Sequence, residues 1–240
     1  MAHKLRFWFV LVLAIPLIAA CSQKRVQVEV PPVAPVEGIE RILVLPFENF
    51  TSDPGLAWEF ETRVIERLRA SGWYASVESA RTSQVLADLG IMPDDFSTPL
   101  GRRRIIEELR ADAVIFGEAT FYFEDVYLDG VVCSGCNNPN VRNTWFTNQY
   151  SAVDIHITAR MVNLHTGEEV HMHRAAIHEW DVITRYLNWY EDEAPPASLI
   201  PSVNRQQIPA LRERAISRAV HEFTKDILPT YEWRIVEEDM

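Results

Sequence analysis

The sequence has little positive charge for its size. Among 240 residues, 23 are lysine or arginine and 34 are aspartate or glutamate, which gives a formal net charge of −11. Proteins that bind nucleic acid neutralise its phosphates with basic patches. The charge balance therefore argues against a nucleic-acid partner, and it disfavours broad adhesion to anionic lipid.

The chain also lacks the short motifs that mark common catalytic and nucleotide-binding sites. It contains no G-x-S-x-G, no Walker loop, no G-x-G-x-x-G and no H-E-x-x-H sequence. We therefore expect a protein that is not an enzyme and that needs no cofactor. A hydrophobic content of 48% and a charged content of 24% are typical of a globular chain, with enough residues for one sizeable core or two small ones.

The apolar run near the N-terminus is too short to cross a membrane comfortably as a helix. Residues 7–18 are apolar, Lys4 and Arg6 precede them, and small residues follow at positions 19 and 20. This order of a basic, an apolar and a small-residue region predicts a secretory signal peptide over residues 1–20. An uncleaved anchor helix is the alternative.

The end of this segment, Ile18-Ala19-Ala20-Cys21, resembles the lipobox of bacterial lipoproteins. The resemblance implies cleavage before Cys21, lipid on its sulfur and an acylated new N-terminus, and several acyl chains together give stable anchoring. Ser22 in this context implies sorting to the outer membrane. Residues 21–38 contain three prolines and no helical periodicity, which predicts an extended tether between lipid and domain.

Residues 39–240 predict one α/β domain. Residues 42–45 are a continuous apolar run, typical of a strand buried on both faces. A helix over residues 55–70, ended by Gly72, and a strand over 73–78 complete a β-α-β unit whose strands we expect to be parallel. Helical patterns also cover residues 80–89, the segment after Thr98-Pro99, and residues 209–228.

Two further strands are expected at residues 112–122 and 153–161, the second alternating strictly between apolar and polar residues. A turn at Thr166-Gly167 would return the chain over residues 170–180 as an antiparallel hairpin. With that turn, Met161 would lie opposite Met172 and Arg160 opposite His173. The predicted fold is therefore a single mixed β-sheet flanked by helices, with a C-terminal antiparallel hairpin and a closing amphipathic helix.

Three blocks of the sequence resemble a family of bacterial envelope lipoproteins. They are ILVLPFENF at 42–50, RADAVIFGEAT at 110–120 and ARMVNLHTGEEV at 159–170. The family includes the curli-secretion protein CsgG, the penicillin-binding-protein activator LpoB and relatives of the N-terminal domain of TolB. The resemblance implies a periplasmic α/β domain that acts through protein contacts, with a peptidoglycan synthase or a secretion component as the class of partner. The blocks are core strands and a turn, so they carry over no functional residue.

The chain departs from the pore-forming members in two insertions, near residues 123–150 and 181–205. In CsgG-like pores these regions are hairpins that span the membrane, each strand needing about 9 to 11 residues with an apolar lipid face. Here Glu124, Asp125 and Asp129 interrupt the first, and the sequence EDEAPP at 191–196 interrupts the second. We therefore expect a docking or regulatory module rather than a channel subunit, which remains the alternative; oligomers are compatible with either.

Cys133 and Cys136 are the only cysteines besides Cys21. In the oxidising periplasm we expect them to form a disulfide within a loop. A redox C-x-x-C site would place its first cysteine at a helix N-terminus, and these two lie in a loop rich in Asn and Gly. A metal site is the other alternative, and its candidate ligands are His156, His171, His173 and His178.

Several aromatic residues lie in or beside the two insertions. They are Trp145, Phe146, Tyr150, Trp180, Tyr186, Trp189 and Tyr190. Exposed aromatic side chains are enriched at protein interfaces, so we predict a partner-binding site built from both loops. Packing of these side chains on one another and on the sheet edge is the alternative. The acidic residues near Trp189 favour a partner with basic groups.

Overall fold

The computed structural model describes residues 24–80, 98–136 and 138–236. These residues form two compact units. The larger, which we call the core unit, spans Val33–Leu228. The smaller contains the terminal segments up to Pro32 and from Pro229. Its described part is the terminal ribbon, in which β1 (Lys24–Val30) pairs with β9 (Thr230–Val236).

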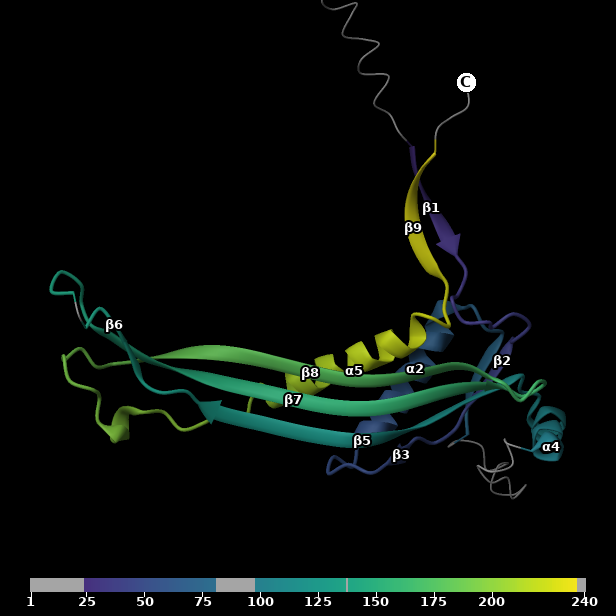
Figure 1. The fold of residues 1–240 in the computed structure, drawn as a ribbon, viewed down its shortest axis with the longest axis horizontal. Helices are drawn as coiled ribbons and strands as arrows, with labels where there is room; N and C mark the ends of the chain where they lie inside the picture. The colour runs from purple at the N-terminus through teal and green to yellow at the C-terminus, as the bar shows by residue number, and fades with distance from the viewer. Residues whose placement is uncertain (1–23, 81–97, 137, 237–240) are drawn as a thin grey trace, which may run out of the picture. The chain divides into compact units, whose positions relative to one another are not determined.

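The core unit is built on one mixed sheet with helices (Figure 1). Its elements in chain order are β2 (Arg41–Val44), β3 (Glu48–Asn49), α2 (Leu56–Ser71), β4 (Ser76–Ser79), α4 (Pro99–Leu109), β5 (Ala113–Leu128), β6 (Val132–Ser134), β7 (Thr144–Asn163), β8 (Glu169–Leu187), η2 (Ala197–Leu199) and α5 (Ile208–Thr224). The strand order is β4-β2-β5-β7-β6, with β3 beside β5 and β8 beside β7. This confirms the fold class predicted from the sequence.

The β-α-β unit forms as the sequence predicts. Strand β2 runs parallel to β4 on one side and to β5 on the other. Its apolar residues are buried on both faces, because Ile42 and Val44 belong to one hydrophobic core and Leu43 to another. Helix α2 ends at Gly72, which has a φ of 64°, in the left-handed region where glycine carries little strain. Helix α4 begins after Thr98, whose hydroxyl accepts a hydrogen bond from the Gly101 amide. The helix predicted over residues 80–89 lies almost entirely outside the described residues.

Two hydrophobic cores lie on opposite faces of the sheet. The larger packs α2 and α5 against the sheet, with Phe60, Phe223 and Ile157 among its buried side chains. The smaller core includes Ile105 of α4 and Val114 of β5. Both residues are fully buried, and burial of a side chain of this size contributes about 1.5 to 3 kcal/mol.

The β7–β8 hairpin has a different register from the one that we predicted. Arg160 lies opposite Met172 and Met161 opposite His171, one residue away from the expected pairs. The turn is longer than a two-residue loop: Gly167 donates from its amide to the carbonyl of Asn163, and the register shifts by one residue next to Met161. A β-bulge therefore sits where the prediction had a regular hairpin.

The two expected insertions are largely continuations of the core strands. Strand β5 pairs with β7 as far as Leu128, opposite Gln149, and β8 pairs with β7 as far as Leu187, opposite Trp145. Three long strands, β5, β7 and β8, therefore extend as one antiparallel sheet well beyond the helix-covered core (Figure 1). In the part of the chain that the structure describes, no helix is long and apolar enough to cross a membrane.

Asp112 joins three segments at the end of the sheet where β2 and β5 begin. Its carboxylate accepts hydrogen bonds from the amide of Glu40, from the amide and guanidinium of Arg41, and lies 3.3 Å from Nε2 of His165 in the β7–β8 turn. Burial raises the pKa of this carboxyl group, but the hydrogen bonds from Arg41 and His165 outweigh burial and lower the pKa to about 2. The ionised carboxylate is therefore the form that holds these segments together.

We expect Asp112→Ala to lower the free energy of unfolding at pH 7 by about 1 to 3 kcal/mol, because the amides of Glu40 and Arg41 lose their acceptor. A depressed carboxyl pKa contributes stability above the unfolded-state value, which is lost as pH falls toward 2. Urea titrations at pH 7 and near pH 2 should therefore show a large difference in the free energy of unfolding between wild type and variant only at pH 7. The same difference at both pH values would contradict this role. Glu107→Ala, in an exposed pair with Arg103, is the control.

Candidate interaction surface

The long three-stranded sheet has two unlike faces. We call the face that packs against α5 the inner face and the opposite one the outer face. The inner face is identified by its contacts with α5: the side chain of Glu179 lies 3.3 Å from Arg218, and Nε2 of His171 lies 3.1 Å from the carbonyl oxygen of Phe223. Burial lowers the pKa of His171, which favours its neutral form. No helix that the structure describes covers the outer face beyond the region of α4.

A β-bulge in β5 decides which of its residues reach the outer face. The register with β7 shifts between Ala119 and Phe121. Before the shift, Ala119 lies opposite Ile157 and both are buried on the inner face. After the shift, Phe121 lies opposite His156, whose side chain is on the outer face. Because side chains alternate along a strand, one extra residue moves all later odd-numbered residues of β5 outward.

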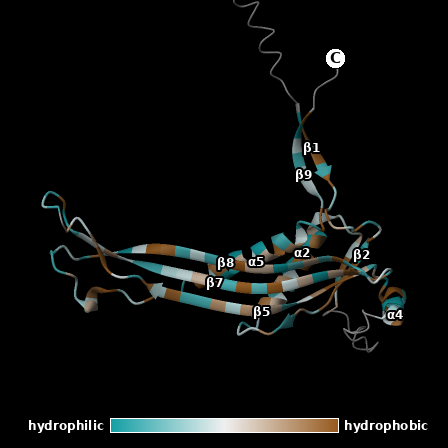
Figure 2. Ribbon diagram, in the orientation of Figure 1, coloured by the Kyte–Doolittle hydropathy of each residue, from teal (hydrophilic) through white to brown (hydrophobic). Residues whose placement is uncertain are grey.

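As a result, seven large aromatic side chains share the outer face. They are Phe121, Phe123 and Tyr127 of β5, Phe146 and Tyr150 of β7, and Trp180 and Tyr186 of β8. Five of the seven are substantially exposed, with Trp180 at 60% and Tyr186 at 72%. We call this set the outer aromatic face. Figure 2 shows the hydrophobic and hydrophilic residues that alternate along these strands.

Ring contacts link neighbours on this face. The rings of Tyr127 and Tyr150 stack with centroids 5.1 Å apart, Phe121 lies 4.8 Å from the ring of His156, and Phe146 lies 6.2 Å from Tyr186. Such pairs gain about 0.5 to 1.5 kcal/mol each beyond the area they bury. The contacts hold the rings in place while one side of each remains open, so the surface is ordered before anything binds to it.

Polar groups on the same face are mostly paired with one another. Nδ1 of His178 lies 2.6 Å from the carboxylate of Asp154, and the hydroxyl of Thr184 donates to the side-chain oxygen of Asn148 at 2.9 Å. Each pair joins β7 to β8 between the aromatic residues. The face therefore offers a mixed surface of aromatic rings and satisfied polar groups, the composition that is enriched at protein interfaces.

The inner face beyond the core is polar but closed by the chain itself. Thr147, Gln149 and Ser151 are almost fully buried. Gln149 exchanges two hydrogen bonds with the backbone of Asn204, at 2.7 and 2.8 Å, and Ser151 donates to Gln207. The segment after β8 thus folds under the sheet and satisfies these buried groups, so the inner face is not available to a partner.

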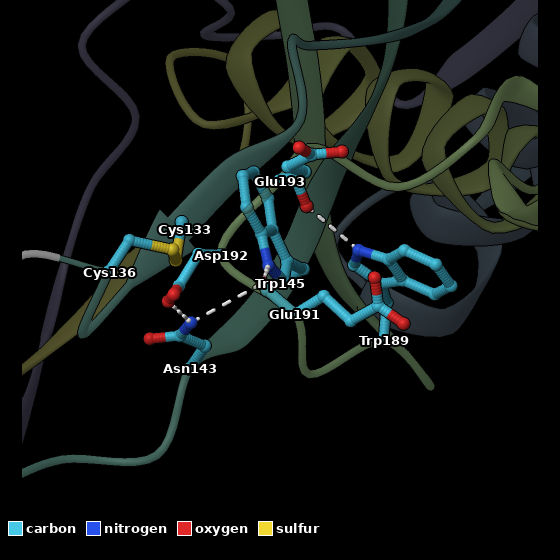
Figure 3. The surroundings of a disulfide bond; sticks show 8 residues. All are labelled: Cys133, Cys136, Asn143, Trp145, Trp189, Glu191, Asp192 and Glu193. Atoms are coloured by element: carbon cyan, nitrogen blue, oxygen red, sulfur yellow. Dashed lines mark hydrogen bonds between the residues drawn. A yellow bond between two sulfur atoms is a disulfide. The ribbon is translucent and has the colours of Figure 1, made fainter.

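The same segment secures the far end of β7 (Figure 3). The indole of Trp145 donates to the carbonyl of Glu191 at 2.9 Å, and the amide of Asn143 donates to the carboxylate of Asp192 at 2.7 Å. Trp145 is only 8% exposed. Trp145 therefore packs within the fold, which is the alternative to partner binding that the sequence left open.

The seven aromatic residues predicted for a partner site therefore divide into two groups. Phe146, Tyr150, Trp180 and Tyr186 belong to the outer aromatic face. Trp145 is buried on the inner side, and Trp189 and Tyr190 lie on the following loop. The indole of Trp189 donates to the carbonyl of Glu193, and the guanidinium of Arg142 lies 3.7 Å above the ring of Tyr190.

Sequence reasoning missed Phe121, Phe123 and Tyr127. The strand expected from the sequence ends at residue 122 and leaves Phe123 and Tyr127 in a polar insertion, and the bulge is what places all three side chains on the outer face. The three residues stand at odd positions of one strand, 121, 123 and 127. This spacing predicts that they share one face of β5, but it does not say which face.

The cysteine candidates lie apart from this surface, whereas the histidine candidates divide: His156 and His178 lie on the outer face, and His171 and His173 lie on the inner face. The Cα atoms of Cys133 and Cys136 lie 5.8 Å apart with their sulfurs at disulfide distance (Figure 3). The rings of His171 and His173 are 6.5 Å apart. Among residues 24–80, 98–136 and 138–236, no three histidine, cysteine or acidic side chains are placed to hold a metal ion together.

No protein-family model matches the chain, and no curated protein matches it by sequence. Similar folds occur among solved structures. The PelC dodecamer from Paraburkholderia phytofirmans is 13% identical, with 85% of this chain and 98% of that chain covered at a TM-score of 0.40. Lipoprotein GNA1162 from Neisseria meningitidis is 15% identical, with 75% and 95% covered at 0.41. The LpoB C-terminal domain from Salmonella enterica is 18% identical, with 60% and 87% covered at 0.36.

Two substitutions, one of a buried tryptophan and one of an exposed tyrosine, separate packing roles from surface roles. We expect Trp145→Ala to lower the free energy of unfolding by about 3 to 5 kcal/mol, because it leaves a cavity and removes a hydrogen bond. We expect Tyr186→Ala to lower it by no more than about 1.5 kcal/mol, because this side chain is mostly in solvent and the substitution removes its ring contact with Phe146. Equal losses in urea denaturation would show that the outer aromatic face is part of the fold's packing.

Proposed function

We propose that this protein is a lipid-anchored, periplasmic protein of the bacterial outer membrane that acts without catalysis, by docking a protein partner on its outer aromatic face. The observation that carries the docking proposal is the gathering of seven aromatic side chains on one uncovered sheet face. A peptidoglycan synthase or a secretion component is the class of partner that the sequence resemblance implies.

The anchoring part of the proposal rests on the N-terminal sequence. A basic start, the apolar residues 7–18 and the small residues before Cys21 give the order expected of a lipoprotein signal. Ser22 directs the anchored protein to the outer membrane in this interpretation. Several acyl chains on Cys21 would hold the protein at the membrane without a spanning segment.

The docking part rests on the chemistry of the outer aromatic face. Tyrosine, tryptophan and phenylalanine supply large contact areas at a small cost in side-chain entropy, and they dominate the binding energy of protein interfaces. Most monomeric proteins keep exposed apolar patches small, so an array of this size marks a binding surface. Acidic residues at 191–193 lie in the loop that follows Tyr190 and would favour basic groups at the rim of the partner.

A subunit of an oligomeric channel is the second candidate, and strand length favours it. Strands β5, β7 and β8 have 16, 20 and 19 residues, more than the 9 to 11 or so that a spanning strand needs. Against it, the pair of Asp154 and His178 lies within the outer face, and a charged side chain facing lipid costs up to about 2 to 4 kcal/mol at mid-bilayer. The inner face is occupied by the chain's own loop.

Photo-crosslinking in cells tests the docking surface. We expect a photoreactive phenylalanine analogue at position 180 or 186 to form adducts with one other envelope protein of defined mass. The matched control is the same analogue at Trp58, which is 53% exposed on helix α2, where no such adduct should form. Adducts with a second copy of the chain would favour the channel, and no adducts at either position would refute docking at this face.

The anchor is tested separately by mass spectrometry of the N-terminal peptide. We expect the mature chain to begin at Cys21 and to carry the mass of a diacylglyceryl group and a further acyl chain. Cys21→Ser should abolish this modification and leave the chain with its signal peptide. An unmodified Cys21 in protein purified from the envelope would refute anchoring while leaving the docking surface untested.

A further inference from the structure

The terminal ribbon has almost no hydrophobic core of its own. It pairs residues from the two ends of the chain over seven positions, from Lys24 opposite Val236 to Val30 opposite Thr230. None of its described side chains is buried. A two-stranded ribbon is marginally stable in water unless one of its faces is covered. We therefore expect the ribbon to be stabilised by contact with another surface.

One face of this ribbon has a distinctive composition. Alternation along β9 places Tyr231, Trp233 and Ile235 on the same side, and they are 58%, 67% and 53% exposed. Their strand partners on that side are Glu29, Gln27 and Arg25. The hydroxyl of Tyr231 donates to the carboxylate of Glu29 at 3.3 Å. Aromatic rings with polar tips beside an aliphatic residue are typical of side chains at the boundary between lipid headgroups and acyl chains.

The opposite face of the ribbon differs in a way that provides a control. It carries Arg234 and Glu232, which lie 3.5 Å apart as an ion pair, together with the valines of β1. Aromatic side chains are confined to the first face. A surface that selects aromatic residues would therefore contact Trp233 and leave Glu232 in water.

Covalent geometry limits how far this face can lie from the proposed lipid. Strand β1 begins three residues after Cys21, and an extended chain spans at most about 3.6 Å per residue, so Lys24 lies within about 11 Å of Cys21. Gln27, which pairs with Trp233, lies within about 22 Å by the same measure. If Cys21 is acylated, the aromatic face of the ribbon lies within reach of the bilayer that holds the acyl chains.

We infer that the aromatic face of the terminal ribbon, formed by Tyr231, Trp233 and Ile235, rests in the headgroup region of the membrane that anchors Cys21. This rests on the proposed lipid anchor. The contact is driven by aromatic and aliphatic burial rather than by charge, because Glu237, Glu238 and Asp239 follow the ribbon in the sequence and offset the basic residues at its start. It fixes the C-terminal segment at the same surface as the N-terminal lipid.

The test uses the lipidated full-length protein in vesicles of phosphatidylethanolamine and phosphatidylglycerol. Ile235→Cys introduces a thiol for a fluorescent label on the aromatic face, and Glu232→Cys places the same label on the opposite face of the same strand. The parent protein should bind no label, because Cys21 is acylated and Cys133 and Cys136 lie at disulfide distance. Spin-labelled lipids that quench at headgroup depth report whether each label is at the membrane.

We expect quenching of the label at position 235 and little or none at position 232, with no change at high salt. If neither label is quenched, or if both are quenched equally, the inference is overturned. Protection of position 235 from a water-soluble quencher in detergent, without quenching by lipid, would show that protein covers the ribbon and would also overturn it. The N-terminal mass is measured on the same sample, so a failed inference with Cys21 acylated leaves the anchor standing.

Trp233→Ala is the functional variant of the same test. We expect it to remove the quenching of a label at position 235, because the largest ring of the face is lost. Val26→Ala, on the opposite face and 37% exposed, should leave the quenching unchanged. If both variants lose quenching while amide hydrogen exchange shows that β1 and β9 remain paired, the face assignment is wrong. If the pairing is lost as well, the comparison of the labels at positions 235 and 232 in the otherwise unchanged protein decides.

Discussion

The pairing of β7 on both of its long edges is the constraint on which the core unit depends. Residues 149–163 of this 20-residue strand pair with β5 on one side, and residues 145–162 pair with β8 on the other. Side chains alternate strictly along such a strand, so the alternation of β7 assigns a face to its neighbours. The inner side, from Trp145 to Met161, is buried throughout. Helix α5 and the loop after β8 both cover this buried side, so the alternation of β7 determines which face of the sheet they pack against.

Two irregularities adjust this arrangement. The bulge in β5 turns Phe121 outward, and the bulge beside Met161 sets the register of the hairpin. The first has a functional consequence, because without it Phe121, Phe123 and Tyr127 would point to the inner face and the outer face would keep only the four aromatic residues of β7 and β8. The strand beyond the bulge also sends Tyr122 and Val126 inward, where they pack on the main core. One extra residue in β5 thus determines which of its side chains lie on the outer face and which lie on the inner face.

The two proposals concern different units of the chain. The docking surface lies in the core unit, on a sheet whose other face is closed by Gln149 and the loop that bonds to it. The membrane contact lies in the terminal ribbon, which joins the core unit through the chain at Pro32 and at Pro229. If both hold, the protein has two separate surfaces of aromatic residues for two kinds of partner: a lipid headgroup layer and a protein. Ring contacts link six of the seven aromatic residues of the first surface to a neighbouring ring, and β pairing holds those of the second.

Local sequence patterns determined the elements whose burial depends on nearby residues. The strand at 42–45, the caps at Thr98 and Gly72, the alternation of residues 153–161 and the C-terminal helix could all be read from residue types and spacing. These features follow from short-range sterics and from which side chains avoid water. The lipobox-like ending at Cys21 is likewise a local signal.

Tertiary structure alone decided the rest. The pairing of residues 24–30 with 230–236 joins segments some two hundred positions apart, and no local pattern encodes which strand a free edge will select. The bulge after Ala119 is a feature of the register of β5 against β7, whose paired residues there are more than thirty positions apart in the sequence. The outer aromatic face exists because register and bulge together bring side chains from three strands to one side, and register is a property of the assembled sheet.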